Sequence, residues 1–371
     1  MALLQYIHAS SRDLAVDLEF DICLTGGEPG VFDAEAQALG AQLYHLPFSR
    51  RNLRGFTSAF RQLLKRGRYA AVHDHQDYAA GFHFGLAAGC LPPVRLVHVH
   101  NPILHMKNYI TGPLRRASVS VGRRLVARYA TGIVGTSNQL LHEYGYDRPP
   151  FARINRGATH CGFDVSRFHA DRQSHHAEIC REFGWDPSVK IVLFAGRLDS
   201  NADQKLNQKN PAFALEIARC CLESDERFRF LFAGGGDAAR SDFEDKVRQW
   251  GRSAEIRFIG LRTDIPKLMV GADLFLFPSV GEGLGMVAVE AQAAGLPVLA
   301  ADTVPEEAVV LPELVQFLSL SRSVSEWAGA AIRLACKPRL DASYCNRAVG
   351  ASAFSIQNSA AGLTRLYMGA A

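Results

Sequence analysis

Short apolar segments alternate with longer helical patterns along almost the whole chain. This alternation is typical of parallel β-sheets covered by helices, because parallel strands are buried on both faces and need a long crossover connection. The sequence predicts an α/β protein with two α/β units in series. We expect strands at 20–24, 42–46, 70–74, 94–99 and 132–136, and then at 190–195, 228–233, 256–259, 273–277 and 297–300.

A polar stretch separates these two series. Residues 169–189 interrupt the strand pattern and end in a turn that contains Pro187, so we expect the linker there. With 371 residues, the chain is long enough for two domains that each bury a core. We therefore predict an N-terminal domain over 1–168, a C-terminal domain over 190–344, and a helical segment without a strand over 345–371.

The N-terminus departs from the usual pattern of a doubly wound domain. Such a domain opens with a strand and a glycine-rich turn. Here Leu3, Leu4, Tyr6 and Ile7 instead form one side of an amphipathic segment. We expect the first strand, normally central in its sheet, to be missing. Unpaired backbone groups cost about 1–3 kcal/mol each when buried, so either the true start lies upstream or the sheet closes differently.

Composition and charge exclude several classes of protein. The net charge of +4 indicates no nucleic-acid partner, although residues 1–170 carry 19 basic and 12 acidic side chains. The eight cysteines contain no C-x-x-C pair and indicate buried thiols in a reducing compartment. There is no secretion signal and no apolar run of the ~18 residues that span a bilayer. We expect a cytoplasmic protein.

The segment 273–302 (DLFLFPSVGEGLGMVAVEAQAAGLPVLAAD) holds the densest group of candidate functional residues. A strand ends at Pro278, a glycine-rich loop follows, and a helix begins near Met286. Backbone N–H groups and the positive end of a helix then lie just beyond the carboxyl end of a strand, where α/β folds bind phosphorylated ligands. The sequence predicts an anion-binding loop formed by Gly283, Leu284, Gly285 and Met286.

Glu290 is the one charged residue in the apolar stretch from Met286 to Ala294. A helix of this composition is buried nearly all round, so its carboxylate needs a partner. Two ribose hydroxyls could donate to it, and each charge-assisted hydrogen bond contributes about 1.5–3 kcal/mol. The alternative is an outward-facing glutamate on a half-exposed helix.

The stretch E282-G-L-G-M-V-A-V-E290 resembles the Glu-x7-Glu motif of retaining glycosyltransferases of family 4, and most of all their bacterial capsular and exopolysaccharide branch. The resemblance implies the GT-B fold, with two Rossmann-like domains facing a cleft and a C-terminal helix that crosses back. It implies that Glu290 holds the nucleotide ribose, that Glu282 lies beside the transferred sugar, and that the amides of 283–286 bind phosphate.

Two cations belong to the same resemblance. Arg197 follows a strand in A195-G-R-L-D199, and Lys209 lies in Q208-K-N-P211. The resemblance implies that both neutralise the donor diphosphate, with Gly196 at the strand end. No D-x-D motif stands where a divalent ion would be held, so we expect no metal and no cofactor. Gly260 and Arg262 resemble the segment whose backbone contacts the base.

Histidine pairs end two strands of the N-terminal half: His73 with His75, and His98 with His100. A metal site is possible, but we expect imidazoles that alternate along a strand to point to opposite faces, so we predict none. The resemblance implies that His100 touches the transferred sugar from the acceptor side. His75 is the next candidate for the cleft, with a structural role as its alternative.

The chain is thus expected to transfer a sugar, with retention, from a nucleotide diphosphate donor to a glycan or lipid-linked acceptor in cell-surface polysaccharide biosynthesis. UDP is favoured over GDP. Arginine-rich stretches at 49–55, 65–68, 115–116 and 123–128 suggest weak docking on an anionic membrane. Two alternatives stay open: a nucleotide-sugar 2-epimerase of the same fold, and a non-catalytic or truncated partner subunit.

Overall fold

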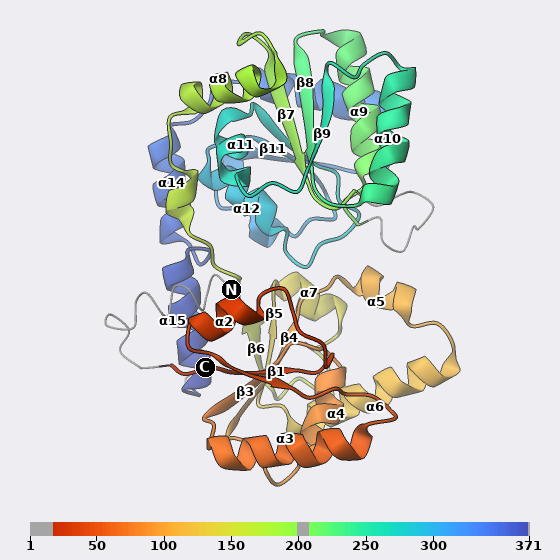
Figure 1. The fold of residues 1–371 in the computed structure, drawn as a ribbon, viewed down its shortest axis with the longest axis vertical. Coiled ribbons are helices and arrows are strands. Elements are labelled where there is room, and N and C mark those ends of the chain that lie inside the picture. The colour runs from red at the N-terminus through yellow and green to blue at the C-terminus, as the bar shows by residue number, and fades with distance from the viewer. Residues whose placement is uncertain (1–17, 199–207, 370–371) are drawn as a thin grey trace. The chain divides into compact units, whose positions relative to one another are not determined.

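The computed structural model describes residues 18–198 and 208–369, and the chain divides into two compact units (Figure 1). The N-terminal unit comprises Met1–Ile103, Tyr109–Asp164 and Ser355–Ala371, and the C-terminal unit comprises Leu104–Asn108 and Val165–Phe354. Each unit is built from parallel strands and helices, which confirms the predicted α/β class. None of the helices in the described ranges is both long and apolar enough to cross a membrane.

The C-terminal unit contains one six-stranded parallel sheet in the order β12-β11-β10-β7-β8-β9. The chain adds strands outward from β7 on one side and then returns to β10 on the other, so the direction of winding switches between β7 and β10. Five of these strands match predicted segments, and β12 was not predicted. The strands are β7 (Lys190–Ala195), β8 (Phe228–Ala233), β9 (Ile256–Gly260), β10 (Leu274–Phe277), β11 (Val298–Ala301) and β12 (Val315–Leu318).

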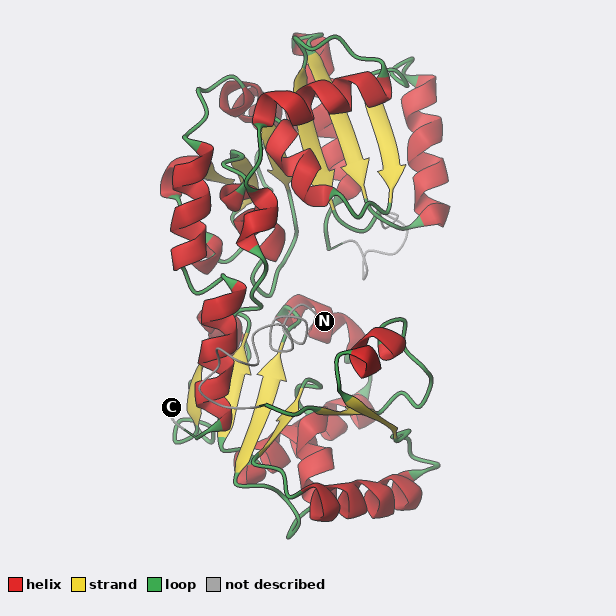
Figure 2. Ribbon diagram, turned by 60° about the vertical axis from the view of Figure 1, so that its left-hand side comes forward, coloured by secondary structure: helices red, strands yellow, loops and turns green. Residues whose placement is uncertain are grey.

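Helices pack on both faces of this sheet (Figure 2). One face carries α9 (Pro211–Ser224) and α13 (Val324–Ala335), with α10 (Asp237–Gln249) beside β9. The other carries α8 (Arg172–Phe183), α11 (Ile265–Gly271), α12 (Met286–Ala293) and α14 (Ala342–Ala351). Two short 3-10 helices, Glu306–Ala308 and Pro312–Leu314, precede β12. Strands β7, β8, β10 and β11 consist almost entirely of buried aromatic and aliphatic residues, and this burial supplies the main driving force for the unit.

The segment 169–189, expected as the linker, belongs to the C-terminal unit instead, and the division falls between Asp164 and Val165. After a 3-10 helix at Val165–Phe168, α8 begins at the N-cap Asp171 and ends at Gly184 in the left-handed conformation. Ile179 and Cys180 are buried on its inner side, which packs against α11. The polar composition that suggested a linker is the exposed side of an amphipathic helix.

The strands of the N-terminal unit form two parallel sheets. β1 (Asp21–Leu24) pairs with β2 (Gln42–His45), and the second sheet has the order β3-β4-β5-β6. Its strands are β3 (Ala71–Asp74), β4 (Val94–Val99), β5 (Gly132–Gly135) and β6 (Asn155–Ala158). All but β6 were predicted. The prediction that the first strand is missing was made from the segment that begins at Met1, and this segment lies outside the described residues.

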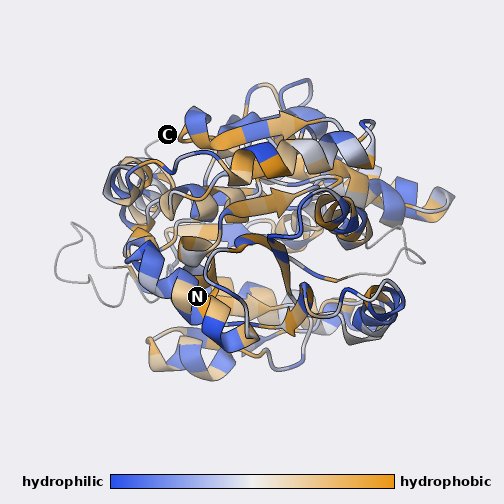
Figure 3. Cartoon of the chain, turned by 90° about the horizontal axis from the view of Figure 1, so that it is seen from above, coloured by the Kyte–Doolittle hydropathy of each residue, from blue (hydrophilic) through white to orange (hydrophobic). Residues whose placement is uncertain are grey.

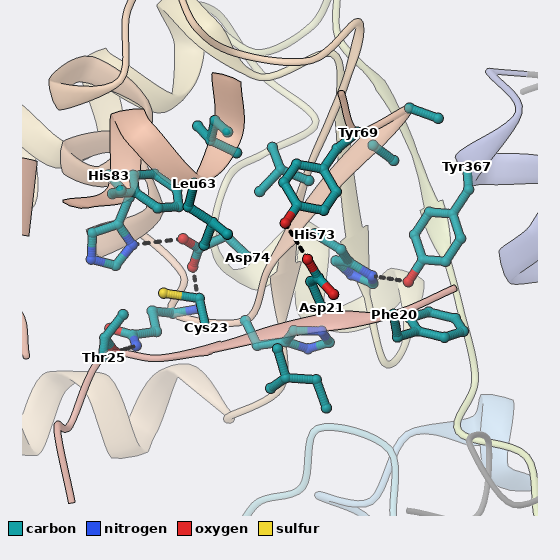
Figure 4. Close-up of a pocket in the computed structure, with 18 of the residues that line it drawn as sticks. Phe20, Asp21, Cys23, Thr25, Leu63, Tyr69, His73, Asp74, His83 and Tyr367 are labelled. Carbon is teal, nitrogen blue, oxygen red and sulfur yellow. Dashed lines mark hydrogen bonds and ion pairs between the residues drawn. The ribbon is translucent and has the colours of Figure 1, made fainter. Parts of the chain in front are cut away.

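A pocket of about 370 Å³ lies between β1 and β3 (Figure 4). Side chains, not backbone hydrogen bonds, bridge the two strands: Tyr69 donates to Asp21, and Gln76 donates to Thr25. Tyr69 precedes β3 and Asp21 begins β1, whereas Gln76 and Thr25 follow the two strands, so β1 and β3 run in the same direction. The facing edges of both strands line the pocket.

Helices complete the N-terminal unit. They are α2 (Asp33–Ala38), α3 (Leu53–Gly67), α4 (Ala79–Leu86), α6 (Pro113–Tyr129), α7 (Asn138–Glu143) and α15 (Ile356–Tyr367), whereas residues Leu104–Asn108 of α5 (Ile103–Tyr109) belong to the C-terminal unit. Helix α3 buries Phe56, Phe60 and Leu64. Figure 3 shows that helices of this protein carry both hydrophobic and hydrophilic residues. The predicted terminal segment 345–371 contains α14 and α15 and no strand; α15 belongs to the N-terminal unit, where Ser359 Oγ accepts from the Gly162 N–H at 3.0 Å.

Candidate active site

The loop that follows β10 meets the connection between β7 and α9 in an ion pair. Lys209 Nζ donates to Glu282 Oε1 at 2.7 Å, and the Glu282 side chain is only 7% exposed. Ser279 Oγ donates to the same carboxylate at 2.6 Å, and Gln208 Nε2 lies 3.3 Å from its other oxygen. The two predicted residues are therefore in direct contact, at the point where the winding of the sheet switches.

The ends of β7 and β8 approach each other so closely that only glycine fits. A Cβ on Gly234 would lie 1.8 Å from the Gly196 carbonyl oxygen, and Gly234 has φ +154°. A Cβ on Gly196 would lie 2.8 Å from Cγ of Lys209. The predicted Gly196 thus lets Lys209 run across the end of β7 toward Glu282.

Helix α12 begins where the glycine-rich loop ends, as predicted. Gly285 is its N-cap, with φ +92°, and Met286 is the first helical residue. The first-turn N–H groups of a helix have no acceptor within the helix and carry the positive end of its dipole. Gly283, Leu284 and Gly285 are buried, so the predicted anion-binding loop is a tightly packed turn.

The Glu290 carboxylate has no hydrogen bond and no ion pair with any residue that the structure describes. Burial raises the pKa of Glu290, while Arg167 and Lys209 act in the opposite direction. Neighbours on α12 are fully buried, including Val289 and Ala291. A partly buried carboxylate without a protein partner is set up to accept hydrogen bonds from a ligand.

Two arginines accompany these residues. Arg197, which directly follows Gly196, is exposed at the end of β7. Arg167, in the 3-10 helix 165–168, acts electrostatically on Glu290 and was not identified as a site residue from the sequence. Its position in the motif H160-C-G-F-D-V-S-R-F168, which resembles the family's linker, was the available signal.

Gly260 and Arg262 lie beside the same edge, but the Arg262 side chain is engaged elsewhere. Gly260, with φ +65°, accepts from the Gly234 N–H at 2.8 Å. Arg262 forms ion pairs with Glu182 at 2.6 Å and Asp264 at 2.7 Å, and both raise its pKa. These contacts tie α8 to the loop before α11.

His100 belongs to the N-terminal unit, in a group of four imidazoles. His73 and His75 stack on each other with ring centroids 4.2 Å apart, and His98 and His100 with centroids 3.9 Å apart. The expectation that the paired imidazoles point to opposite faces was wrong, because residues two apart along a strand share a face. The four rings are gathered on one side of β3 and β4.

The arrangement in the C-terminal unit suits a diphosphate linked to a ribose. The loop amides and helix dipole favour an anion, Lys209 and Arg197 supply positive charge, and Glu290 can accept from hydroxyl groups. All predicted donor-site residues of this unit lie at the carboxyl ends of β7, β9 and β10 or in the connections that follow them. That edge is where open α/β sheets bind ligands.

Two family models match the chain, one in each half. The model for glycosyl transferases group 1 matches residues 189–337, and the model for a glycosyl transferase 4-like domain matches residues 5–156. EpsF of Bacillus subtilis, named as a glycosyltransferase, is 29% identical over 363 residues, covering 94% of this chain and 88% of EpsF.

Other proteins share the fold or part of the sequence. A D-inositol 3-phosphate glycosyltransferase of Mycobacterium marinum is 29% identical over 71% of this chain and 55% of its own length. The crystal structure of Anabaena HepE in complex with UDP superposes with a TM-score of 0.74 at 17% identity, covering 98% of this chain and 95% of HepE. These likenesses confirm the predicted GT-B fold. The chain is a glycosyltransferase with this fold, of the family 4 type.

Proposed function

We propose that this chain is a retaining glycosyltransferase that moves a sugar from a UDP-sugar to a glycan or lipid-linked acceptor in cell-surface polysaccharide biosynthesis. The similarity to EpsF, named as a glycosyltransferase, extends over most of both chains and supports the transfer of a sugar. HepE, which shares the fold, binds UDP and UDP-glucose in its crystal structures, and this supports a uridine nucleotide.

The observation that carries the proposal is the partnerless Glu290 carboxylate on α12 beside the Lys209–Glu282 ion pair. Two ribose hydroxyls would donate to Glu290. The diphosphate would lie on the amides of 283–286, where Lys209 and Arg197 offset its charge. Glu282, held by Ser279 and Gln208, would then face the sugar with a fixed orientation.

These residues stabilise the departing nucleotide. As the bond from the sugar C1 to the diphosphate oxygen breaks, negative charge grows on that oxygen, and fixed cations and amides stabilise it. In a front-face reaction the same oxygen accepts the proton of the acceptor hydroxyl while the new bond forms on the same face of C1. The step needs no protein nucleophile, and we infer that it needs no bound metal.

We assign the acceptor to the N-terminal unit, with His100 as the residue that contacts the transferred sugar. We also propose a cytoplasmic protein that docks weakly on an anionic membrane surface, supported by exposed Arg50, Arg51, Arg54, Arg116 and Arg124. Basic side chains near an anionic leaflet contribute about 1 kcal/mol each.

A thermal-shift screen with UDP, GDP and ADP tests the donor site, since a ligand at 100 times its Kd adds about 2.7 kcal/mol of stability. We expect stabilisation by UDP; no stabilisation by any of them would refute the nucleotide site. NMR of the product tests retention, and activity in EDTA tests metal independence. Formation of an epimer from UDP-GlcNAc without acceptor would support the 2-epimerase alternative instead.

A further inference from the structure

His73, His75 and His98 accompany His100 in the N-terminal unit, and the proposed transfer gives these three histidines no role. His73 and His75 lie on and just after β3, and His98 and His100 on and just after β4. The register of the two strands places His73 opposite Leu96, and therefore His75 opposite His98. Residues two apart share a face of a strand, so all four rings project from one side.

Three of these side chains converge on one point. One ring nitrogen each from His73, His75 and His98 lies within 4.8 Å of the other two. The shortest separation, His73 Nε2 to His98 Nδ1, is 3.1 Å. Two imidazole nitrogens bound to the same tetrahedral Zn²⁺ at about 2.0–2.1 Å are separated by about 3.3 Å. Side-chain shifts on the order of 1 Å would complete that geometry.

Metal binding uses the neutral form of an imidazole, which has a lone pair on one ring nitrogen. Burial and the neighbouring histidines lower the pKa of His73 and His98, which favours this form. His98 is 4% exposed, and its Nε2 has no hydrogen-bond partner in the described part of the chain. The nitrogen of His98 that lies 3.1 Å from His73 Nε2 is Nδ1, so Nδ1 is the proposed ligand atom and Nε2 stays outside the coordination.

Two further residues fix the orientation of the rings. Tyr367 Oη, from α15, lies 2.9 Å from His73 Nδ1 (Figure 4). His100 Nε2 lies 2.8 Å from His75 Nδ1. Metal-binding histidines commonly have their second nitrogen held in this way. His75 is exposed, which gives an ion a path to the group.

The chemistry of the ligand atoms selects the class of metal. The three proposed ligands are all imidazoles. Asp74, between His73 and His75, points away from them and binds His83 Nδ1 at 2.6 Å (Figure 4). Neutral nitrogen donors suit Zn²⁺, Co²⁺, Ni²⁺ and Cu²⁺, whereas Mg²⁺ and Ca²⁺ need oxygen ligands.

We propose that His73, His75 and His98 bind one transition-metal ion of the zinc class, with Tyr367 and His100 orienting the ligands. The ion would cross-link β3 and β4 and, through Tyr367, hold α15 against them. This site is separate from the donor-binding residues, all of which belong to the C-terminal unit, so it is independent of the metal requirement of the transfer step.

The test uses the full chain without a polyhistidine tag, stripped with chelator and then titrated with Zn²⁺. We expect about one tightly held Zn²⁺ per chain after desalting, a rise in Tm with Zn²⁺ and none with Mg²⁺, and visible absorption bands of a nitrogen-bound tetrahedral site with Co²⁺. His75→Gln, at an exposed position, should raise the Kd for Zn²⁺ at least ~100-fold, and Tyr367→Phe by the ~10- to 100-fold typical of an orienting partner.

His142→Gln is the matched control, because His142 is 65% exposed, pairs with Asp147 and is not one of the three converging histidines. It should bind Zn²⁺ as the wild type does. Circular dichroism of each metal-free variant establishes that it is folded. Equal Zn²⁺ affinity of folded His75→Gln and wild type, or weak binding that His142→Gln reduces to the same extent, would overturn the proposal.

Discussion

Lys209 and Glu282 join the two halves of the C-terminal sheet at the point where its winding switches. Their side chains meet at 2.7 Å, although the residues are 73 positions apart in the chain. Lys209 Nζ also lies over the ring of Phe277, 5.0 Å from the ring centroid. The cation proposed to bind the diphosphate is thus already positioned before a donor arrives, which reduces the reorganisation needed for transfer.

Lys209→Met removes the cation and leaves the buried Glu282 carboxylate uncompensated. We expect kcat to fall about 10²- to 10³-fold and the free energy of unfolding to fall by roughly 3 kcal/mol. The double variant Lys209→Met/Glu282→Gln should regain most of that stability but no activity. Urea unfolding and initial rates measure the two effects. Recovery of turnover in the double variant would contradict the assigned role of Lys209.

Glu290→Gln keeps the shape of the side chain and removes its charge. We expect UDP to bind about 10- to 100-fold more weakly, by calorimetry, because a charge-assisted hydrogen bond is lost. Since burial raises the pKa of Glu290, the wild-type affinity should fall as pH drops through that raised pKa. UDP itself also titrates, but it does so equally for both proteins, so the ratio of wild-type to variant affinity reports the titration of Glu290 alone. A ratio that does not change with pH would contradict the proposed contact between Glu290 and UDP.

Gly234→Ala inserts a Cβ where the backbone of Gly196 leaves no space. We expect a folded protein of reduced Tm that no longer binds UDP, because the end of β7 must move. Gly350→Ala is the control within the same unit: it lies in α14 with nothing within 4 Å of the added Cβ. That change should be neutral or stabilise by about 0.4–1 kcal/mol. The measurements are thermal melts and UDP titration.

The basic surface is tested by co-sedimentation with vesicles that contain anionic lipid. We expect binding at low salt that is lost at high salt, since exposed charges are screened within about 10 Å at 0.1 M. Reversal of three exposed charges, Arg50→Glu, Arg51→Glu and Arg54→Glu, should abolish it, and neutral vesicles should not sediment the wild type. Binding that is insensitive to salt and to charge reversal would exclude this mode of docking.

The sequence predicted most strands because they are dense, short apolar segments. It missed β6 (Asn155–Ala158), whose residues Asn155 and Arg156 are exposed, and β12, which follows two short 3-10 turns. Both are outer strands of their sheets, where one side of the ladder is unpaired and the apolar signal is weak.

The predicted donor residues could be chosen from local motifs, but their partners could not. Gln208 binds Glu282 only because two loops that are far apart in the sequence meet in three dimensions. Arg167 acts on Glu290 across more than 100 residues of sequence. The engagement of Arg262 by Glu182 likewise depends on how α8 packs, which the polar composition of 169–189 concealed.

The pocket between β1 and β3 determines which part of the N-terminal unit unfolds locally. No backbone hydrogen-bond ladder joins β1 to β3, so side chains hold the β1–β2 ribbon in place. One of them is Phe48, whose ring centroid lies 4.9 Å from that of Phe56. Such a ribbon can detach as a separate cooperative segment while the β3–β6 sheet stays intact. Amide hydrogens of Ile22 and Cys23 should therefore exchange with deuterium much sooner than those of Val97 and Ile133, which lie in the interior of the larger sheet.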